Sequence, residues 1–161
     1  YISVRARAQK STDKYMTVEK PTIDCSISLS SIPVNLTNAK PSELYNDEET
    51  AAELMFMGRV IPRSCNNNNR DKRVIGIDYH IDYNLFHETV SQIVRQVSEA
   101  IPDLTKVHIV HRTGFVATGD HTVVVTIGSR HRTTAALAVD IIVGRLKAEA
   151  FVEKTEICSC K

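Results

Sequence analysis

The sequence contains no tryptophan and no apolar run close to the roughly 20 residues that a membrane-spanning helix needs. It also lacks an excess of charge of either sign, because 20 lysine and arginine residues oppose 19 aspartate and glutamate residues. A net charge of +1 is not typical of proteins that bind nucleic acid through a strongly basic face. These absences favour a globular domain, since 161 residues with 42% hydrophobic content can bury one core without cross-links.

Metal-binding cysteine motifs are missing too. No C-x-x-C pair occurs among Cys25, Cys65, Cys158 and Cys160, and the last two are too close for an easy mutual disulfide. We therefore expect free thiols in a reducing compartment. The histidines show no helical i, i+4 pairing with an acid, so we expect neither a metal site nor a resident cofactor.

Composition divides the chain into three parts. Residues 1–20 lack sustained periodicity and are basic, which predicts a loose N-terminal extension or the remnant of an organellar targeting segment. Residues 21–157 are predicted to form a single domain, and residues 158–161 a tail. Within the domain, four consecutive asparagines at 66–69 predict a mobile loop, which is either functional or a solvated hairpin tip.

Apolar patterning predicts a set of strands. They cover residues 23–36, interrupted near Pro33, and residues 52–60, 73–81, 106–111 and 122–127. In the third of these, alternation gives one apolar face, made of Ile75, Ile77, Tyr79 and Ile81. The stretch between Gly114 and Gly119 is predicted to be rich in turns, and residues 41–49 to be a polar, partly helical connection.

Two main helices are predicted. In residues 86–101 the apolar side chains fall on one stripe, and Pro102 ends the pattern. Ser129 is a suitable N-cap for a second helix. Its predicted core positions are Ala135, Ala136, Val139, Ile142, Val143 and Leu146. Because the strands and helices lack βαβ regularity, the sequence predicts an α+β fold with a mixed or antiparallel sheet.

The second predicted helix carries the residues that suggest chemistry. His131 and Arg132 fall in its first turn, where free N–H groups and the helix dipole favour an anion. Lys147 lies at its far end, and Lys154 follows it. Taken alone, Lys147 is explained by the helix dipole, and Arg132 is explained as a solvated surface residue. If the fold or a second copy brings the segments together, they form a cationic pocket for a phosphate or carboxylate.

Ordered motifs then connect these residues to a known family. They are GRV at 58–60, GIDYHID at 76–82, HRTG at 111–114, Gly119-Asp120, HRTTA at 131–135, Leu146-Lys147, Lys154 and Glu156. With this set, which spans about two thirds of the chain, the sequence resembles the MoaE family, the large catalytic subunits of molybdopterin synthase.

The resemblance implies an α/β hammerhead-type fold and a homodimer that binds a small ubiquitin-like subunit with a Gly-Gly C-terminus, giving a heterotetramer. It implies sulfur transfer from that thiocarboxylated C-terminus to cyclic pyranopterin monophosphate, which forms molybdopterin. Lys147 matches the catalytic lysine, Lys154 the second active-site lysine, and His131 and Arg132 the anion-binding pair. A cytoplasmic location is expected, with a mitochondrial one as the alternative.

Departures from the family pattern fall near the expected site. The arginine that follows G-x-V in the family is Ile61 here, although Arg63 lies two residues on and is a candidate replacement. Phe151 and Glu153 replace a proline and a tryptophan, and Asp82 replaces an aromatic residue. They leave open a second hypothesis, a non-catalytic MoaE-like structural subunit of a larger, mitochondrial assembly, beside the preferred enzyme.

Overall fold

The structure is a computed structural model that describes residues 23–34, 49–65, 72–149 and 152–160. Several sequence-based predictions concern residues outside these ranges. They are the N-terminal extension, the connection at 41–48, the asparagine run and the environment of Phe151.

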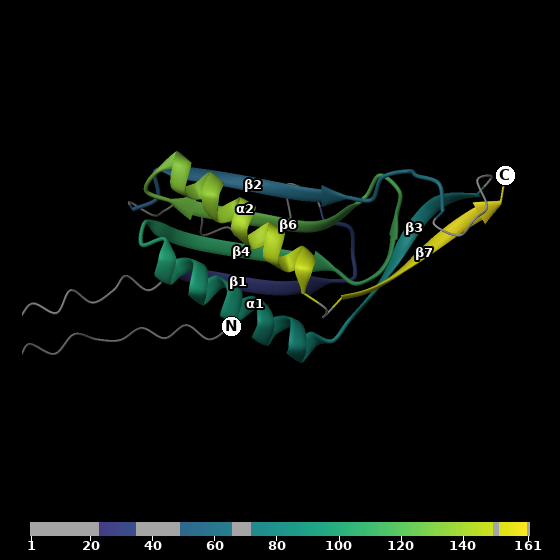
Figure 1. The fold of residues 1–161 in the computed structure, drawn as a ribbon, viewed down its shortest axis with the longest axis horizontal. Helices are drawn as coiled ribbons and strands as arrows, with labels where there is room; N and C mark the ends of the chain where they lie inside the picture. Colours follow the sequence, from purple (N-terminus) through teal and green to yellow (C-terminus); the bar gives the residue numbers. More distant parts are fainter. Residues whose placement is uncertain (1–22, 35–48, 66–71, 150–151, 161) are drawn as a thin grey trace, which may run out of the picture.

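Two sheets and two helices make up the described part of the chain (Figure 1). The larger sheet has the order β1 (Asp24–Ser30), β4 (Leu104–Arg112), β6 (His121–Ser129), β2 (Ala52–Arg59). In it, β1 is parallel to β4, and the other pairs are antiparallel. The smaller, antiparallel sheet has the order β5 (Gly114–Ala117), β3 (Lys72–Ile81), β7 (Val152–Cys160). The predicted α+β class and mixed sheet arrangement are confirmed.

Helices α1 (Tyr83–Ala100) and α2 (Arg132–Ala148) lie across one face of the larger sheet, and the smaller sheet extends from its end (Figure 1). The main core fills the space between these layers, with Ile109 and Ile127 from the sheet and Ile93 and Ile142 from the helices fully buried. Neither helix is long and apolar enough to cross a membrane.

Helix α1 follows its predicted pattern closely. Asp82 caps it by accepting a 2.8 Å hydrogen bond from the Leu85 N–H, which satisfies one of the free donors of the first turn. The buried stripe is Phe86, Val90, Ile93, Val94 and Val97. The helix ends at Ala100, just before Ile101 and Pro102.

The start of α2 corrects two predictions. His131 is the N-cap, whereas Ser129 is still the last residue of β6, and its hydroxyl donates to the Asp103 carbonyl at 3.0 Å. Strand pairing therefore continues through Ser129 and delays the helix. Ala138 is buried where Ala136 was predicted, because Ala136 faces solvent.

Strand β3 contains a bulge that the sequence pattern did not predict. Tyr79 points into the core as expected, but Ile75 is 43% exposed and Val74 is buried. The pairing register with β7 shifts between Val74 and Gly76, so one extra residue reverses the alternation upstream of it. The predicted single apolar face is therefore wrong for Ile75.

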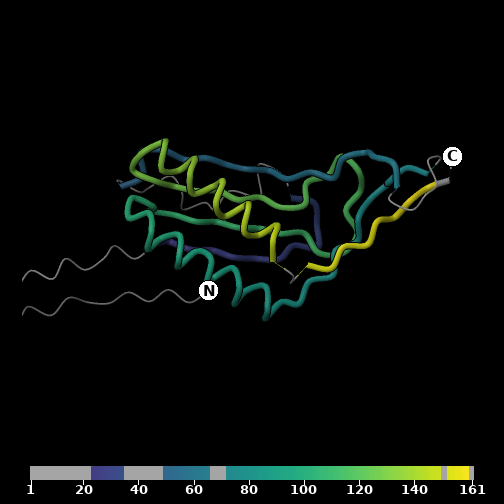
Figure 2. The backbone as a smooth tube through the Cα atoms, viewed as in Figure 1, coloured from purple at the N-terminus to yellow at the C-terminus, as the bar shows by residue number. Residues whose placement is uncertain are grey.

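Strands β5 and β7 were not predicted as strands. β5 lies between Gly114 and Gly119, whose φ angles of +76° and +98° favour glycine at both bends. β7 leaves the end of α2 and runs beside β3, as the backbone tube shows (Figure 2). Together they make β3 the centre of a second, smaller sheet with its own small core, Val60, Val74, Tyr79 and Val116.

The expectation of free thiols is wrong for two cysteines. Cys65 and Cys158 form a disulfide, with Cα atoms 6.4 Å apart across a sequence separation of 93. The pairing of β7 with β3 brings them together, because the segment that contains Cys65 lies beside the start of β3. Cys25, in contrast, is a free and exposed cysteine.

Candidate active site

Lys147 occupies the last turn of α2, where a positive charge interacts favourably with the helix dipole. Its Nζ lies 5.6 Å from the centroid of the Phe56 ring on β2, a distance at which a cation–π interaction forms. The neighbouring cation of this turn, Arg145, turns to α1 instead and donates to Gln96 Oε1 at 2.8 Å. Lys147 is thus the exposed cation of this turn on the β2 side of the helix.

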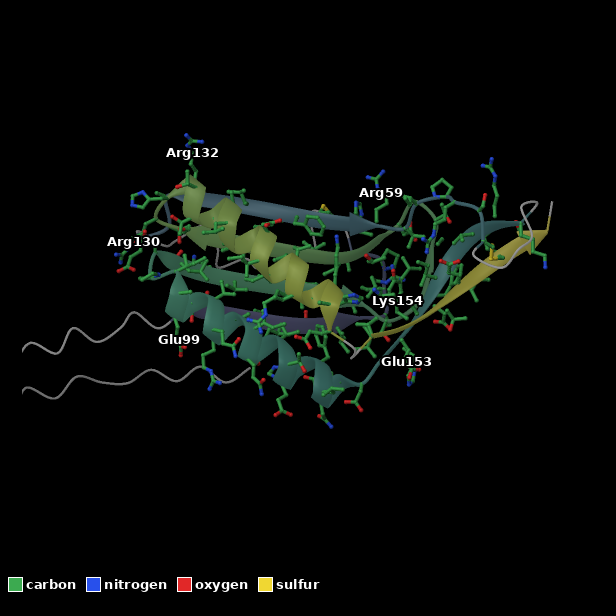
Figure 3. The ribbon with its side chains drawn as sticks, in the orientation of Figure 1. Arg59, Glu99, Arg130, Arg132, Glu153 and Lys154 are labelled. Carbon is green, nitrogen blue, oxygen red and sulfur yellow. A yellow bond between two sulfur atoms is a disulfide. The ribbon has the colours of Figure 1, made fainter. Side chains whose placement is uncertain are left out.

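Lys154 lies where the two sheets meet. It pairs with Tyr79 across β7 and β3, and directly opposed residues of an antiparallel pair share a face, so Lys154 lies beside the buried Tyr79 ring. In Figure 3 it lies near the C-terminal end of α2, the end that carries Lys147. Glu156, two positions further along β7, is on the same face.

His111 of β4 lies between Tyr79 of β3 and Phe86 of the main core. Its ring is 5.5 Å from that of Tyr79 and 6.2 Å from that of Phe86, and its Nδ1–H donates to the Arg112 carbonyl at 2.7 Å. Burial lowers the pKa of His111, the Arg112 hydrogen bond opposes this, and the charge of Lys154 lowers it further. The imidazole is therefore neutral at pH 7, with Nε2 as an acceptor.

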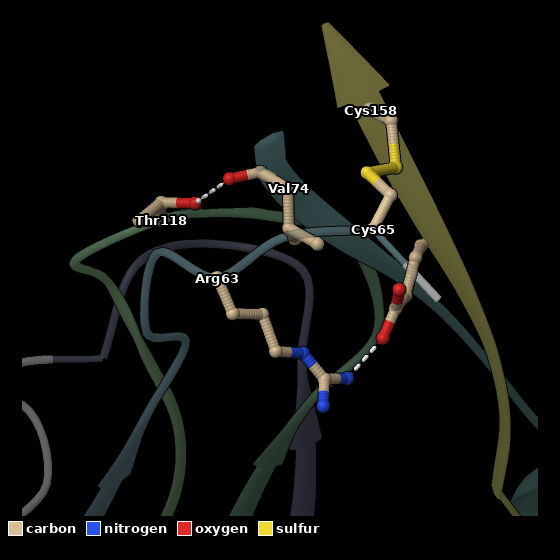
Figure 4. The surroundings of a disulfide bond; sticks show 6 residues. Arg63, Cys65, Val74, Thr118 and Cys158 are labelled. Atoms are coloured by element: carbon tan, nitrogen blue, oxygen red, sulfur yellow. Dashed lines mark hydrogen bonds and ion pairs between the residues drawn. A yellow bond between two sulfur atoms is a disulfide. The ribbon is translucent and has the colours of Figure 1, made fainter. Parts of the chain in front are cut away.

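Arg63 reaches the same region from the segment that follows β2. It forms an ion pair with Glu156 of β7 (Figure 4), and its side chain remains 49% exposed. Burial raises the pKa of Tyr79, while a hydrogen bond with Thr122 and the charge of Arg63 oppose this rise. Arg63, Tyr79, His111, Lys154 and Glu156 form one group, the junction cluster, between the two sheets.

His131 and Arg132 are not part of this cluster. His131 is the N-cap of α2 and Arg132 its first residue, and the 15 positions from Arg132 to Lys147 correspond to about 22 Å of helix. Figure 3 labels Arg132 and Lys154 at opposite ends of α2. One chain therefore does not bring His131 and Arg132 together with Lys147 and Lys154, because a rigid helix separates the two pairs. The second alternative, a pocket completed by another copy of the chain, stays open.

Glu153 does not neutralise the lysines within the described residues. It precedes Lys154 on β7 and so points to the opposite face, and it forms no ion pair with either lysine in this part of the chain. Ile61, which stands where the family has arginine, is 62% exposed and supplies no charge. Arg63, two residues on, remains the candidate replacement.

Tyr79, His111 and Glu156 are members of the cluster that sequence reasoning did not assign to the site. Their motifs were visible, since all lie in the matched segments, but nothing local indicated that β7 would pair with β3. The ring of His111 is buried against Tyr79 and Phe86, so this residue also has a structural role. No group of three metal-ligating side chains occurs in the described ranges.

A helix-backed sheet joined end to end with a smaller sheet that carries the cluster defines an α+β protein of hammerhead type. The chain belongs to the MoaE protein family, whose sequence model matches residues 32–149.

Catalytic subunits of molybdopterin synthase are among its relatives. The protein from Drosophila pseudoobscura pseudoobscura is 27% identical over 81% of this chain and 34% of its own length. The one from Taeniopygia guttata is 27% identical over 76% of both chains. The chain thus spans about a third of the fly relatives that it matches.

Solved structures show the same fold. Molybdopterin synthase from Staphylococcus aureus superposes with a TM-score of 0.68 at 22% identity, covering 85% of this chain and 91% of that chain. A complex of subunits 1 and 2 of molybdopterin-converting factor from Helicobacter pylori gives a TM-score of 0.60 at 14% identity, covering 86% of both chains. At these identities the similarity establishes the fold.

Proposed function

We propose that this chain is the catalytic subunit of a molybdopterin synthase. It transfers sulfur from the thiocarboxylated C-terminus of a small ubiquitin-like subunit to cyclic pyranopterin monophosphate, in molybdenum cofactor biosynthesis. The main supporting observation is the junction cluster, which contains the cations Lys154 and Arg63, with Lys154 near the end of α2 that carries Lys147 (Figure 3). The substrate is a phosphate ester and the sulfur donor is a carboxylate derivative, so fixed cations suit both.

The roles follow from the surroundings of each group. Lys147, exposed beside Phe56, acts as the acid or base of the reaction or as a transient acyl acceptor. Lys154 lies close to His111, whose imidazole is neutral. Lys154 therefore contributes its positive charge without repulsion from a protonated His111. Arg63 has donors left over after its bond to Glu156 Oε1, and these bind the anionic substrate.

The protein functions as a homodimer in this proposal. Because α2 holds Arg132 about 22 Å from Lys147, the anion-binding pair of each site, His131 and Arg132, comes from the second copy. The Helicobacter pylori complex of two subunits supports a small partner for each copy. The cytoplasmic location, or the mitochondrial alternative, stays a prediction, as does the division into extension, domain and tail.

Reconstitution tests the proposal. The chain is mixed with a thiocarboxylated partner and cyclic pyranopterin monophosphate, and the dithiolene product is measured. Lys147→Ala is expected to lower turnover at least about 100-fold, the range for loss of a general acid or base, while the dimer persists. Arg145→Ala is the matched control, because it removes a cation of the same helical turn that contacts α1 instead. Undiminished product formation by Lys147→Ala would refute the role of this lysine.

The alternative is a non-catalytic MoaE-like structural subunit. One observation favours it: the arginine that could replace the family's residue is already paired with a carboxylate, Glu156. The same reconstitution separates the two functions. A wild-type chain that binds the partner and gives no product, under conditions where a Staphylococcus aureus synthase does, supports the structural role.

A further inference from the structure

Segment 60–65 runs from β2 to the smaller sheet and is held at both ends. At its start, Val60 is buried and exchanges hydrogen bonds with the turn before β6, to Asp120 at 3.0 Å and from Gly119 at 2.8 Å. At its end, the Cys65 N–H donates to the Lys72 carbonyl at 3.1 Å. Arg63 lies between these two anchors.

Two cross-links join this segment to β7 (Figure 4). One is the ion pair of Arg63 with Glu156, and the other is the Cys65–Cys158 disulfide. Arg63 and Cys65 are two positions apart in the segment, and their partners Glu156 and Cys158 are two positions apart in β7. The two cross-links therefore run side by side between the same two stretches of backbone. The covalent bond therefore fixes the distance over which the ion pair forms.

The ion pair alone is a weak anchor for Arg63. Its arginine side chain is 49% exposed, and an ion pair open to solvent is loosened by side-chain entropy and by salt. The Arg63 backbone has its own support, since its carbonyl accepts from the Val74 N–H at 2.9 Å. Loss of the disulfide would thus leave the segment attached to β3 and free the Arg63 side chain from its fixed place beside β7.

We infer that the Cys65–Cys158 disulfide positions Arg63 for binding of the anionic pterin substrate, and that a dithiol reductant weakens this binding. The inference rests on the proposed function, in which Arg63 binds that substrate. In the reductive step the S–S bond accepts two electrons and two protons and becomes two thiols, while the dithiol is oxidised to its cyclic disulfide. Cys65 and Cys158 are both partly exposed, so a small dithiol has access to them.

Steady-state kinetics on the full chain with its thiocarboxylated partner test the positioning role. Cys158→Ser, or dithiothreitol treatment of the wild type, is expected to raise KM for the pterin phosphate roughly tenfold, the weakening expected from one misplaced charge-assisted hydrogen bond. The value of kcat is expected to stay within about twofold. Cys25→Ser, which removes a free thiol that is exposed and outside the disulfide, is the control and leaves both constants unchanged. A fall in kcat with KM unchanged would overturn the inference.

A double-substitution cycle asks whether the disulfide acts through Arg63. Arg63→Gln is expected to raise KM by a similar factor, and in that background Cys158→Ser adds nothing further. Multiplying effects would show that the disulfide does not act through this arginine.

A readout without turnover separates this inference from the proposed function. Phenylglyoxal labelling, followed by mass spectrometry, measures the accessibility of Arg63 before and after reduction. Faster labelling of Arg63 after reduction, with unchanged labelling of Arg95 on α1, supports the positioning role even if the wild type forms no product. Unchanged labelling of Arg63, or free thiols at both cysteines in the air-oxidised protein, overturns it.

Discussion

Helix α2 determines which subunit supplies each half of the proposed site, and this can be tested by mixing variants. The perturbations are Lys147→Ala and Arg132→Ala, made in separate chains. The two positions are about 22 Å apart on one rigid helix, so neither can reach the other's end within a chain. Each variant homodimer is therefore expected to be inactive, because every composite site lacks one cation.

Mixed dimers of the two variants are expected to recover activity. Each mixed dimer has one site with both substitutions and one intact site, because a two-fold dimer pairs the same surfaces reciprocally. Random exchange makes about half of the dimers mixed, so about a quarter of the wild-type activity should return. The assay is dithiolene formation by co-expressed chains that carry different affinity tags.

A reversed arrangement is the control. In this control, a chain that carries both Arg132→Ala and Lys147→Ala is paired with the wild-type chain. Each composite site of this mixed dimer then lacks one cation, so the mixed dimer should be inactive. A mixed dimer that is active in this arrangement, while the two single variants fail to complement, would show that each site lies within one chain. The reasoning from the length of α2 would then be wrong.

Three further predictions concern stability. Cys158→Ser removes a cross-link across 93 residues and should lower the free energy of unfolding in urea by about 4–5 kcal/mol; a loss under about 1 kcal/mol would contradict this. Gly76→Ala places a Cβ 2.3 Å from the Phe115 ring and 2.7 Å from the Val116 carbonyl, so it should cost about 1–3 kcal/mol. Adding Phe115→Ala should not restore the loss, because the backbone contact remains. Burial lowers the pKa of His111 below its ordinary 6.5, so the unfolded chain takes up a proton at a higher pH than the folded chain does, and the free energy of unfolding should fall as the pH drops through 6.5. In urea titrations at several pH values, His111→Gln should flatten this pH dependence. An unchanged dependence would assign it to other groups.

Local patterns predicted the elements that carry their own signal. Helix α1 has a full apolar stripe, and β2 and β6 are apolar runs bounded by turns. Strand β7 has no such pattern, since its sequence is mostly polar and its partner β3 contains a bulge opposite Ile157 and Cys158. Its pairing depends on a distant strand, which a short sequence window does not contain.

The candidate site was predictable only in part for the same reason. Lys147 and Lys154 could be identified from the resemblance, but their neighbours could not. Tyr79 and His111 become neighbours only through the contact of the two sheets, and Cys65 meets Cys158 only through β7. The local sequence around such residues does not indicate which distant strand they will pair with.

The edge position of β1 bears on the order in which the molecule assembles. β1 pairs in parallel with β4, which begins at Leu104, far downstream of Asp24. During translation, β1 therefore emerges from the ribosome long before β4, the strand with which it pairs. β2, β4 and β6 can form an antiparallel nucleus first, and β1 then docks against an edge that has already been built.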